Sequence, residues 1–477
     1  MEPSPGNQPS PEHALSPPSL PLGDYANAIA YLYGRINYER TAETAPYPFR
    51  LRRMTELLDR LDLRGIAGAD VPVVHIAGTK GKGSTSTMVA SMLTAAGYRT
   101  GLYTSPHLVR LEERFTVDGA LAEPQTVVAL IEALRCEADR MASTDLGAPT
   151  FFEMTTAMAL MHFRNSQCTA VVLEVGLGGK LDSTNVCQPT VTAITSIGFD
   201  HQHILGNTLA EIAAQKAGII KTGVPVISGV SQSEPRAVIE AIARDKSAPL
   251  FTINRDFSVR AAKPDDEATW STCFDFVAHT PPLTDREGWS VPLDGEHQAK
   301  NAAVACAIVD LMEARGVSVP RASQKAGLGC VKIAGRVERF CLSEGVDLIL
   351  DTAHNVDSID ALCRCIERRA MGRPVTLVFG TSKDKEHVPM LAQLAKQADA
   401  MILTRYHGNP RYREPSELLR DLPADSATKA IEAQIIDEPV AALEHAIQSI
   451  AGPHLIIVCG SFFLAAEVRP FLEANFS

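Results

Sequence analysis

A glycine-rich segment has the residue types of a phosphate-binding loop. It runs from Gly78 to Thr85 (GTKGKGST), between a β-branched run and a stretch with helical spacing. Glycines let backbone N–H groups converge on an anion, and a helix start adds a favourable dipole. Lys82 could reach a phosphate, and Ser84 or Thr85 could offer a hydroxyl to Mg²⁺. Because Ser84 rather than lysine follows Gly83, the segment departs from G-x-x-x-x-G-K-[ST]. Its place between strand and helix still favours phosphate binding over a surface turn.

Two further polar side chains are predicted to lie where parallel strands end. Glu174 closes the apolar run TAVVLEVG, and open α/β sheets bind their ligands at that edge. A buried carboxylate is costly unless it binds a cation, so Glu174 could hold Mg²⁺. A helix cap or a structural ion pair would explain Glu174 equally well. His201, in SIGFDH, also follows an apolar run, but a lone histidine near a strand end is usually structural.

Lys216 is notable because its helical neighbours are mostly apolar. The segment Leu209–Ile220 has helical spacing and is rich in Leu, Ile and Ala, so the amine is predicted to be partly buried. A buried amine loses its charge readily, and a neutral lysine can react with carbon dioxide. From helix position alone, a lysine that reaches solvent or pairs with Glu211 is the simpler interpretation.

Short apolar runs alternate with helical segments along most of the chain. The first series comprises VPVVHIAG, RTGLYTS, TAVVLEVG, TVTAITSIG and VPVISGV. A polar, turn-rich stretch follows from Pro249 to about Pro292, and then an alanine-rich helix at Gln298–Ala314. The second series comprises VDLILDTA, RPVTLVFGT, DAMILTRY and PHLIIVCGS. Continuous apolar strands alternating with helices predict parallel sheets covered on both faces.

This alternation predicts two α/β domains behind a short tail. Residues 1–22 are rich in Pro and Ser and are expected to be disordered, because they cannot bury enough surface. Residues 23–330 are expected to form a three-layer, P-loop-type domain with a mostly parallel sheet and a short helical lead. Residues 331–477 are expected to form a smaller, Rossmann-like α/β domain. The boundary is placed in the Gly- and polar-rich stretch 317–334.

Composition excludes several classes of protein. Of 477 residues, 45% are hydrophobic and 21% charged, with a net charge of -11, which disfavours a nucleic-acid binder. The longest apolar run, Leu455–Ala466, is shorter than the roughly 18–20 residues that span a bilayer. No Lys or Arg precedes Arg35, so a secretory signal is not expected. The 10 cysteines form no C-x-x-C pair, which indicates reduced thiols. We therefore expect a soluble cytoplasmic protein.

The glycine-rich loop is the first of several segments that resemble the Mur ligase superfamily, and within it folylpolyglutamate synthase and dihydrofolate synthase. The other segments are TSPHL (104–108), LEVGLGGKLDSTNV (173–186), SIGFDH (196–201), QKAGI (215–219), GEHQAKN (295–301), GRVERF (335–340) and DTAHN (351–355). They occur in the family's order, which makes the set specific. Two positions depart from the family: Thr352 stands where Gly or Tyr is usual, and Lys80 where many bacterial members have Asn.

The resemblance implies a role for each matching residue. The implied ATP-binding residues are Gly78, Thr79, Lys80, Gly81, Lys82, Gly83, Ser84, Thr85, Asn301, Arg336 and Asp351. The implied metal ligands are Ser84, Ser105, Glu174 and His201, at two Mg²⁺ sites. Lys216 is implied to be a carbamate that supplies an anionic oxygen beside magnesium. Asp351 and His354 are implied to hold the incoming amino acid and ATP. The implied catalytic residues are Lys82, Lys216, Asp351 and His354.

The implied reaction is ATP-dependent addition of L-glutamate to folates, and probably to dihydropteroate, through an acyl phosphate. The enzyme is expected to be a monomer without nucleic-acid or membrane partners. A peptidoglycan Mur ligase is less favoured, because too few residues precede Gly78 for the substrate domain of those enzymes. A P-loop switch or kinase would show no glutamate-dependent ADP release. Whether one or both glutamylations occur, the length of the polyglutamate tail and the preferred folate stay open.

Overall fold

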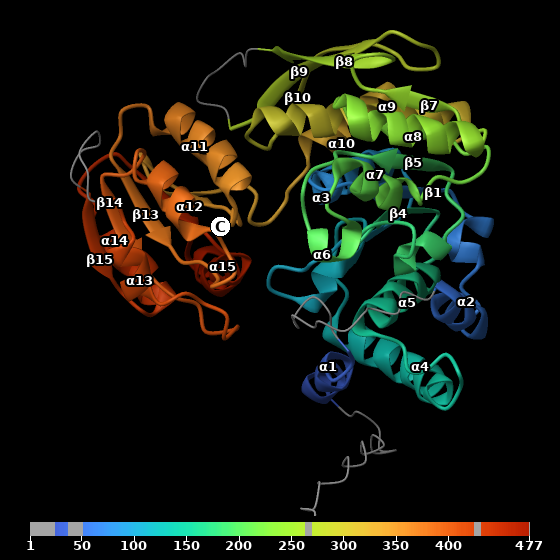
Figure 1. Ribbon diagram of the computed structural model, residues 1–477, viewed down its shortest axis with the longest axis horizontal. Coiled ribbons are helices and arrows are strands. Elements are labelled where there is room, and N and C mark those ends of the chain that lie inside the picture. The colour runs from blue at the N-terminus through green and yellow to red at the C-terminus, as the bar shows by residue number, and fades with distance from the viewer. Residues whose placement is uncertain (1–23, 37–50, 263–269, 424–430, 477) are drawn as a thin grey trace, which may run out of the picture.

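The larger domain is built on a seven-stranded sheet (Figure 1). The computed structural model describes residues 24–36, 51–262, 270–423 and 431–476. In spatial order the strands are β3 (Phe115–Val117), β2 (Thr100–Tyr103), β4 (Ala170–Glu174), β1 (Val73–Ala77), β5 (Val191–Ile194), β6 (Val226–Ser228) and β7 (Leu250–Thr252). All neighbours are parallel except the edge pair β2–β3. Every residue of β1, β2, β4 and β5 is buried, which is why these strands read as continuous apolar runs.

Helices cover both faces of this sheet and give the predicted three layers. One face packs against α3 (Lys82–Ala95) and α9 (Glu296–Ala314), with α10 (Arg321–Gly329) on α3. The helices of the other face are α1 (Tyr25–Tyr33), α2 (Leu51–Arg60), α4 (Pro124–Ala142), α5 (Phe151–Asn165), α7 (Leu209–Ala217) and α8 (Ser233–Asp245). Short helical turns lie at Gly65–Ala69, Leu111–Arg114, Ser183–Val186 and α6 (Gln202–Leu205). Neighbouring residues of β1 point to opposite faces, so Val74 and Val73 enter different cores.

A small antiparallel sheet is present that the sequence analysis did not predict. The stretch described there as polar and turn-rich forms β8 (Phe257–Ala262), β9 (Thr272–Ala278) and β10 (Arg286–Val291), in the order β10-β9-β8. One face carries Phe257, Phe274 and Trp289 into the core that contains α9. The other face is partly exposed, so the apolar residues alternate with polar ones and the stretch resembles a loop in composition.

The second domain has a six-stranded sheet, drawn in orange and red in Figure 1. In spatial order the strands are β11 (Glu338–Ser343), β12 (Val346–Leu350), β16 (His454–Cys459), β13 (Val375–Phe379), β14 (Ala400–Leu403) and β15 (Glu432–Ile435). Only the edge pair β11–β12 is antiparallel. One face packs against α11 (Val356–Ala370), α12 (His387–Leu394) and α13 (Pro415–Arg420). The other packs against α14 (Pro439–Gln448) and α15 (Phe462–Phe476).

The connection between the two sheets lies close to the predicted boundary. Helix α10 ends at Gly329 and β11 begins at Glu338, and we propose the domain boundary within this connection, near residue 330. The predicted tail, residues 1–22, lies outside the described residues. All ten cysteines are free thiols. No helix in the described part of the chain is long and apolar enough to cross a membrane.

Candidate active site

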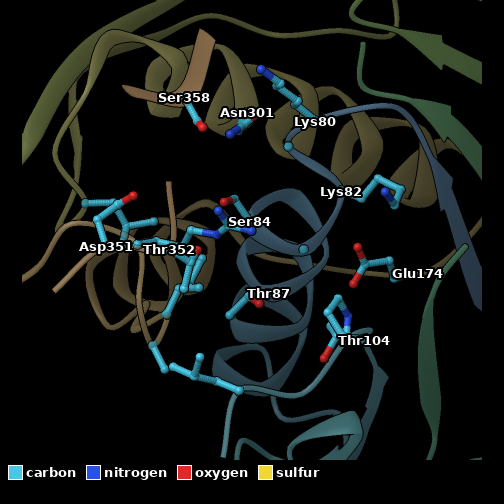
Figure 2. Close-up of a pocket in the computed structure, with 18 of the residues that line it drawn as sticks. Lys80, Lys82, Ser84, Thr87, Thr104, Glu174, Asn301, Asp351, Thr352 and Ser358 are labelled. Carbon is cyan, nitrogen blue, oxygen red and sulfur yellow. The ribbon is translucent and has the colours of Figure 1, made fainter. Parts of the chain in front are cut away.

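A cleft of about 2450 Å³ lies between the two domains and is lined by both. The first domain contributes the loop after β1, the segment after β2 and Glu174 at the end of β4. The second domain contributes Arg336, from the turn before β11, and both Asp351 and His354, which follow β12. Figure 2 shows Lys82 and Glu174 on one side of this cleft and Asp351 and Thr352 on the other. The carboxyl edges of both sheets therefore meet at one place, where α/β sheets bind ligands.

The glycine-rich loop needs glycine at Gly81 for two reasons. Gly81 is the N-cap of α3 and has a φ of +84°, which a side chain disfavours. A Cβ at this position would lie 2.3 Å from Oδ1 of Asn301, on α9. Asn301 therefore lies directly against the loop, as the sequence resemblance implies for two parts of one nucleotide site.

The first half of the loop is fixed by the segment after β5. The N–H of Thr79 donates to the carbonyl of Ser196 at 2.9 Å, and the N–H of Lys80 donates to Ser196 Oγ at 2.9 Å. Thr195 Oγ1 donates to the carbonyl of Lys80 at 2.7 Å. These bonds use the N–H groups of Thr79 and Lys80 internally. The N–H groups at the start of α3 have no partner within the helix, so they are the ones that can bind phosphate.

Glu174 is a buried carboxylate beside the loop. Burial raises the pKa of Glu174, while the charge of Lys82, the N–H of Ser105 and the charge of Arg336 oppose that rise. The N–H of Ser105 donates to Glu174 Oε2 at 3.1 Å. The side chains of Lys82 and Thr104 lie close to the carboxylate in Figure 2. A cation would compensate the burial of this charge, and hard oxygens suit Mg²⁺.

The predicted metal ligands all line the cleft but do not form a complete cage. They are Ser84, Ser105, Glu174 and His201. Within the described ranges, no three His, Cys, Asp or Glu side chains are close enough to hold a metal ion. His201 has a φ of +48° at the N-cap of α6, and its Nε2 lies 3.6 Å from Asp200. A Mg²⁺ ion here would therefore need phosphate and water oxygens besides Glu174, as Mg²⁺ commonly does.

Lys216 is buried, as its apolar neighbours predict, and it contacts the glycine-rich loop at Gly78. Only 4% of the residue is exposed, and its Nζ donates to the carbonyl of Gly78 at 3.0 Å. Burial and the charge of Lys82 lower the pKa of Lys216 to about 7, against the opposing charge of Asp200. The simpler interpretation, a lysine that reaches solvent or pairs with Glu211, is wrong: Lys216 is buried, and Glu211 instead caps the start of α7.

The turn before β11 presents Arg336 to the cleft. The Arg336 side chain is exposed and makes no hydrogen bond or ion pair with the described residues. Asp351 is buried, and its carboxylate accepts hydrogen bonds from the N–H groups of Val337 and Ala353, both at 2.7 Å. Burial raises the pKa of Asp351, and the charge of Arg336 opposes the rise. The Asp351 carboxylate thus holds the backbone beside Arg336.

His354 has one ring nitrogen fixed by the backbone. Its Nδ1 lies 2.8 Å from the carbonyl of Thr352, so Nδ1 carries the proton and Nε2 is left as an acceptor. Burial lowers the pKa of His354; the hydrogen bond to the Thr352 carbonyl opposes this, and the nearby charge of Lys385 acts with burial. His354 is therefore a neutral imidazole at neutral pH, and it lines the cleft.

Two predicted ATP-binding residues do not reach the cleft. Thr85 is fully buried, and its hydroxyl has no hydrogen-bond partner among the described residues. Gly78 lies behind the loop, where its carbonyl accepts from Lys216. Thr87, which was not predicted, lines the cleft one helical turn after Ser84. The other predicted ATP-binding residues, Thr79, Lys80, Gly81, Lys82, Gly83, Ser84, Asn301, Arg336 and Asp351, all line it.

Comparison with known proteins identifies the family. A model of the Mur ligase middle domain matches residues 76–309, and one of the Mur ligase glutamate ligase domain matches residues 335–462. The folylpolyglutamate synthase of Lacticaseibacillus casei is 31% identical over 94% of this chain and 99% of its own. The chain belongs to the folylpolyglutamate synthase/dihydrofolate synthase family of Mur ligases.

Solved structures of this family have the same fold. The folylpolyglutamate synthase of Thermotoga maritima is 30% identical, with a TM-score of 0.80 over 94% of this chain and 97% of its own. The bifunctional folylpolyglutamate synthase/dihydrofolate synthase of Yersinia pestis, solved with AMPPNP and a Mn ion, is 28% identical, with a TM-score of 0.76 over 94% and 98% of the two chains. The chain is therefore an ATP-dependent ligase of the Mur type.

Two further residues that line the cleft, Asp182 and Asp357, were not singled out from the sequence. Asp182 is buried and accepts from the N–H of Leu177 and from both the N–H and the hydroxyl of Thr184. Lys80 Nζ lies 3.2 Å from Asp357 Oδ2 across the cleft, although both side chains are exposed and the pair is weak. An acidic residue inside a glycine-rich segment was a usable signal for Asp182. Nothing local marks Asp357.

Proposed function

We propose that this protein adds L-glutamate to tetrahydrofolate and its polyglutamates, and also to dihydropteroate, with ATP as the energy source. The observation that carries the proposal is one cleft with a nucleotide loop and Glu174 on one side and Arg336 and His354 on the other. The names of the related enzymes, one of them bifunctional, support both acceptors.

The first half-reaction needs charge neutralisation more than covalent chemistry. The acceptor carboxylate attacks the γ-phosphorus of ATP, which gives an acyl phosphate and ADP. The loop N–H groups and Lys82 hold the phosphates, and Arg336 approaches them from the second domain as a rigid, always-charged fork. The Mn ion of the Yersinia pestis structure supports a divalent metal. Ser84, Ser105, Glu174 and His201 would hold two Mg²⁺ ions, which supply positive charge at the phosphates when bound.

The second half-reaction needs a neutral amine. The amine of glutamate attacks the acyl carbon and phosphate departs, but the amine is an ammonium ion at neutral pH and must first lose a proton. His354 presents the lone pair of Nε2 to the cleft and can take that proton. Asp351 supports this step indirectly, because its carboxylate accepts the N–H of Ala353, the residue directly before His354.

Lys216 is proposed to be carbamylated. Its neutral amine would attack carbon dioxide, form the N–C bond and release a proton, which converts an uncharged amine into a carbamate anion. The pKa of about 7, which burial causes, supports this proposal, because a large share of the amine is then uncharged at neutral pH. A carbamate near Lys82 and Asp182 would supply an anionic oxygen to the metal centre.

The main alternative is an enzyme with folylpolyglutamate synthase activity alone; another Mur-type amino-acid ligase is less favoured. Purified protein would be incubated with ATP, Mg²⁺ and glutamate, with dihydropteroate or tetrahydrofolate as acceptor. We expect ADP release that depends on glutamate and on either acceptor, and products one glutamate heavier by mass spectrometry. ADP release with tetrahydrofolate alone would indicate the single activity. ADP release without any glutamate dependence would refute the proposed ligase activity.

We also propose that the protein is a monomer and acts in the cytoplasm, where its ten free thiols stay reduced.

A further inference from the structure

A buried carboxylate of the first domain is held by arginines of the second. Asp294 lies between β10 and α9 and is 5% exposed. Its carboxylate accepts a hydrogen bond from Arg369 Nε and another, at 3.0 Å, from Arg368 Nη2, both on α11. Burial alone would raise the pKa of Asp294, but the hydrogen bonds and charges of Arg369 and Arg368 outweigh it and lower the pKa. Asp294 is therefore ionised and forms a charge pair across the domain boundary.

Trp270 makes a second contact with the same arginine. The Cζ atom of Arg369 lies 4.8 Å from the centroid of the Trp270 ring. The Cζ atom of Arg339, on β11, also lies 4.8 Å from that centroid. The ring packs against the apolar core of the second domain as well. Cation–π contacts of this kind are attractive and depend on geometry, so the contact with Trp270 restricts how β11 and α11 can lie.

A hydrogen bond from a threonine side chain links the segments that contain Trp270 and Asp294. Thr272 Oγ1, at the start of β9, donates to the carbonyl of Leu293 at 2.7 Å. This bond links the strand that follows Trp270 to the segment that contains Asp294. The small antiparallel sheet thus presents Trp270 and Asp294 as one preformed surface.

Each partner of this surface is close in sequence to a group of the active cleft. Asp294 directly precedes Gly295, the N-cap of α9, which carries Asn301 against the nucleotide loop. Arg369 lies on α11, the helix that begins directly after His354 and its N-cap. Arg339 follows Arg336 by three residues. A rotation of the second domain that broke the Asp294 contact would therefore also move Arg336 and His354.

We propose that Asp294 and Trp270 form an interdomain clamp that positions Arg336 and His354 over the nucleotide loop. Both line the cleft, but their contacts are with Arg369 and Arg339, so we assign them as positioning residues. Only the expected effect of the clamp on kcat depends on the proposed function. The orientation of the domains can be measured without any reaction.

The test compares the clamp with a buried ion pair inside one domain. The test variants are Asp294→Asn, Arg369→Met and the double variant. The control is Asp310→Asn, because Asp310 pairs with Arg286 at 2.8 Å within the first domain and both side chains are at most 1% exposed. Spin labels on Cys136 and Cys341, exposed thiols of the first and second domains, would report the interdomain distance once Cys330, the third exposed thiol, is replaced by serine.

With an ATP analogue and Mg²⁺ bound, we expect a narrow distance distribution in the parent protein and in Asp310→Asn, and a broad one in the clamp variants. The kcat of the clamp variants should fall by about 30-fold or more, as when one partner of a buried charge pair is removed. The Kd of the ATP analogue should rise by less than kcat falls, because the loop N–H groups and Lys82 remain in place and only the contact of Arg336 with the phosphates is weakened. The losses of the two single variants should add only in part in the double variant, because both substitutions remove the contact between Asp294 and Arg369. The control should lose thermal stability only.

A narrow, parent-like distance in Asp294→Asn overturns the clamp, and so does a kcat loss matched by an equal loss of nucleotide affinity. Trp270→Leu gives the same test if Asp294→Asn does not fold, because Trp270 is only partly buried. A parent protein that ligates no glutamate would refute the proposed function and would leave the distance measurement valid.

Discussion

Replacing Lys216 with methionine separates a structural lysine from one that serves the metal centre. Methionine keeps an unbranched apolar side chain and removes the amine. Lys221 offers a matched control, because burial also lowers its pKa and its Nζ donates to the carbonyl of Asn185 at 2.8 Å, away from the nucleotide loop. We expect Lys216→Met to lose ligase activity almost completely and Lys221→Met to keep it.

The size of the effect follows from the environment of Lys216. A pKa of about 7 instead of 10.5 makes the charged amine about 4–5 kcal/mol less favourable in the folded protein, at about 1.4 kcal/mol per tenfold change. About half of the amines are then neutral at pH 7, against roughly one in 3,000 for an ordinary lysine. Between pH 7 and 10.5 the unfolded chain binds more protons than the folded one, so the free energy of unfolding should rise with pH in that window. Below pH 7 this gain in the free energy of unfolding is absent, because the amine is protonated in both the folded and the unfolded chain.

Three measurements test this reasoning. Unfolding in metal- and bicarbonate-free buffer should show the rise with pH in the parent protein and not in Lys216→Met. Carbon-13 NMR with labelled bicarbonate should show a carbamate signal in the parent and in Lys221→Met only. Acetate or another small carboxylate should restore part of the activity of a Lys216→Ala variant, because it can replace the missing anionic oxygen.

Two results would refute the argument. A crystal structure of the active, metal-loaded protein at neutral pH with an unmodified Lys216 amine excludes the carbamate. Near-normal glutamate ligation by Lys216→Met excludes any role of the amine in the reaction.

Four other substitutions test the site. Lys82→Ala and Glu174→Gln should each lower kcat by about a hundredfold or more without unfolding the protein; glutamate-dependent ADP release and thermal unfolding measure both, and near-normal ligation would remove that residue from the site. His354→Ala should impair ligation and leave the Kd of an ATP analogue unchanged in calorimetry; an early loss of nucleotide affinity would contradict its role. Gly81→Ala should cost about 1–2 kcal/mol of stability or more and weaken nucleotide binding, because a Cβ would lie 2.3 Å from Asn301 Oδ1. An unchanged Kd of the ATP analogue would show that this loop does not bind the nucleotide.

The parts of the fold that depend on local sequence could be predicted. Strand β1 is buried on both faces, so it reads as an unbroken apolar run, and the glycines after it mark the turn into α3. The burial of Lys216 was predictable for the same reason, because its helical neighbours are apolar. The small sheet β8–β10 was not, since only one of its faces is fully buried and its residues alternate in polarity.

The direction of individual side chains in the site could not be predicted. Ser84 and Thr87 face the cleft while Thr85 is buried, and this depends on the residue at which α3 begins. Each residue turns a helix by about 100°, so an error of one residue in the predicted start of the helix would place a neighbouring side chain in the cleft instead. The contact of Asp294 with Arg369 spans 75 residues, and no local pattern indicates it.

The position of β16 has a consequence for how the chain is made. It is the last described strand, yet it lies at the centre of the second sheet, between β12 and β13. Its Val458 carbonyl also accepts the N–H of Asp351 at 3.0 Å. During synthesis the first domain can fold as soon as it emerges from the ribosome, but the second sheet stays split until residues 454–459 follow. A nascent chain at that stage has its whole nucleotide loop but lacks a folded second domain. It can therefore bind ATP before it can use ATP for ligation.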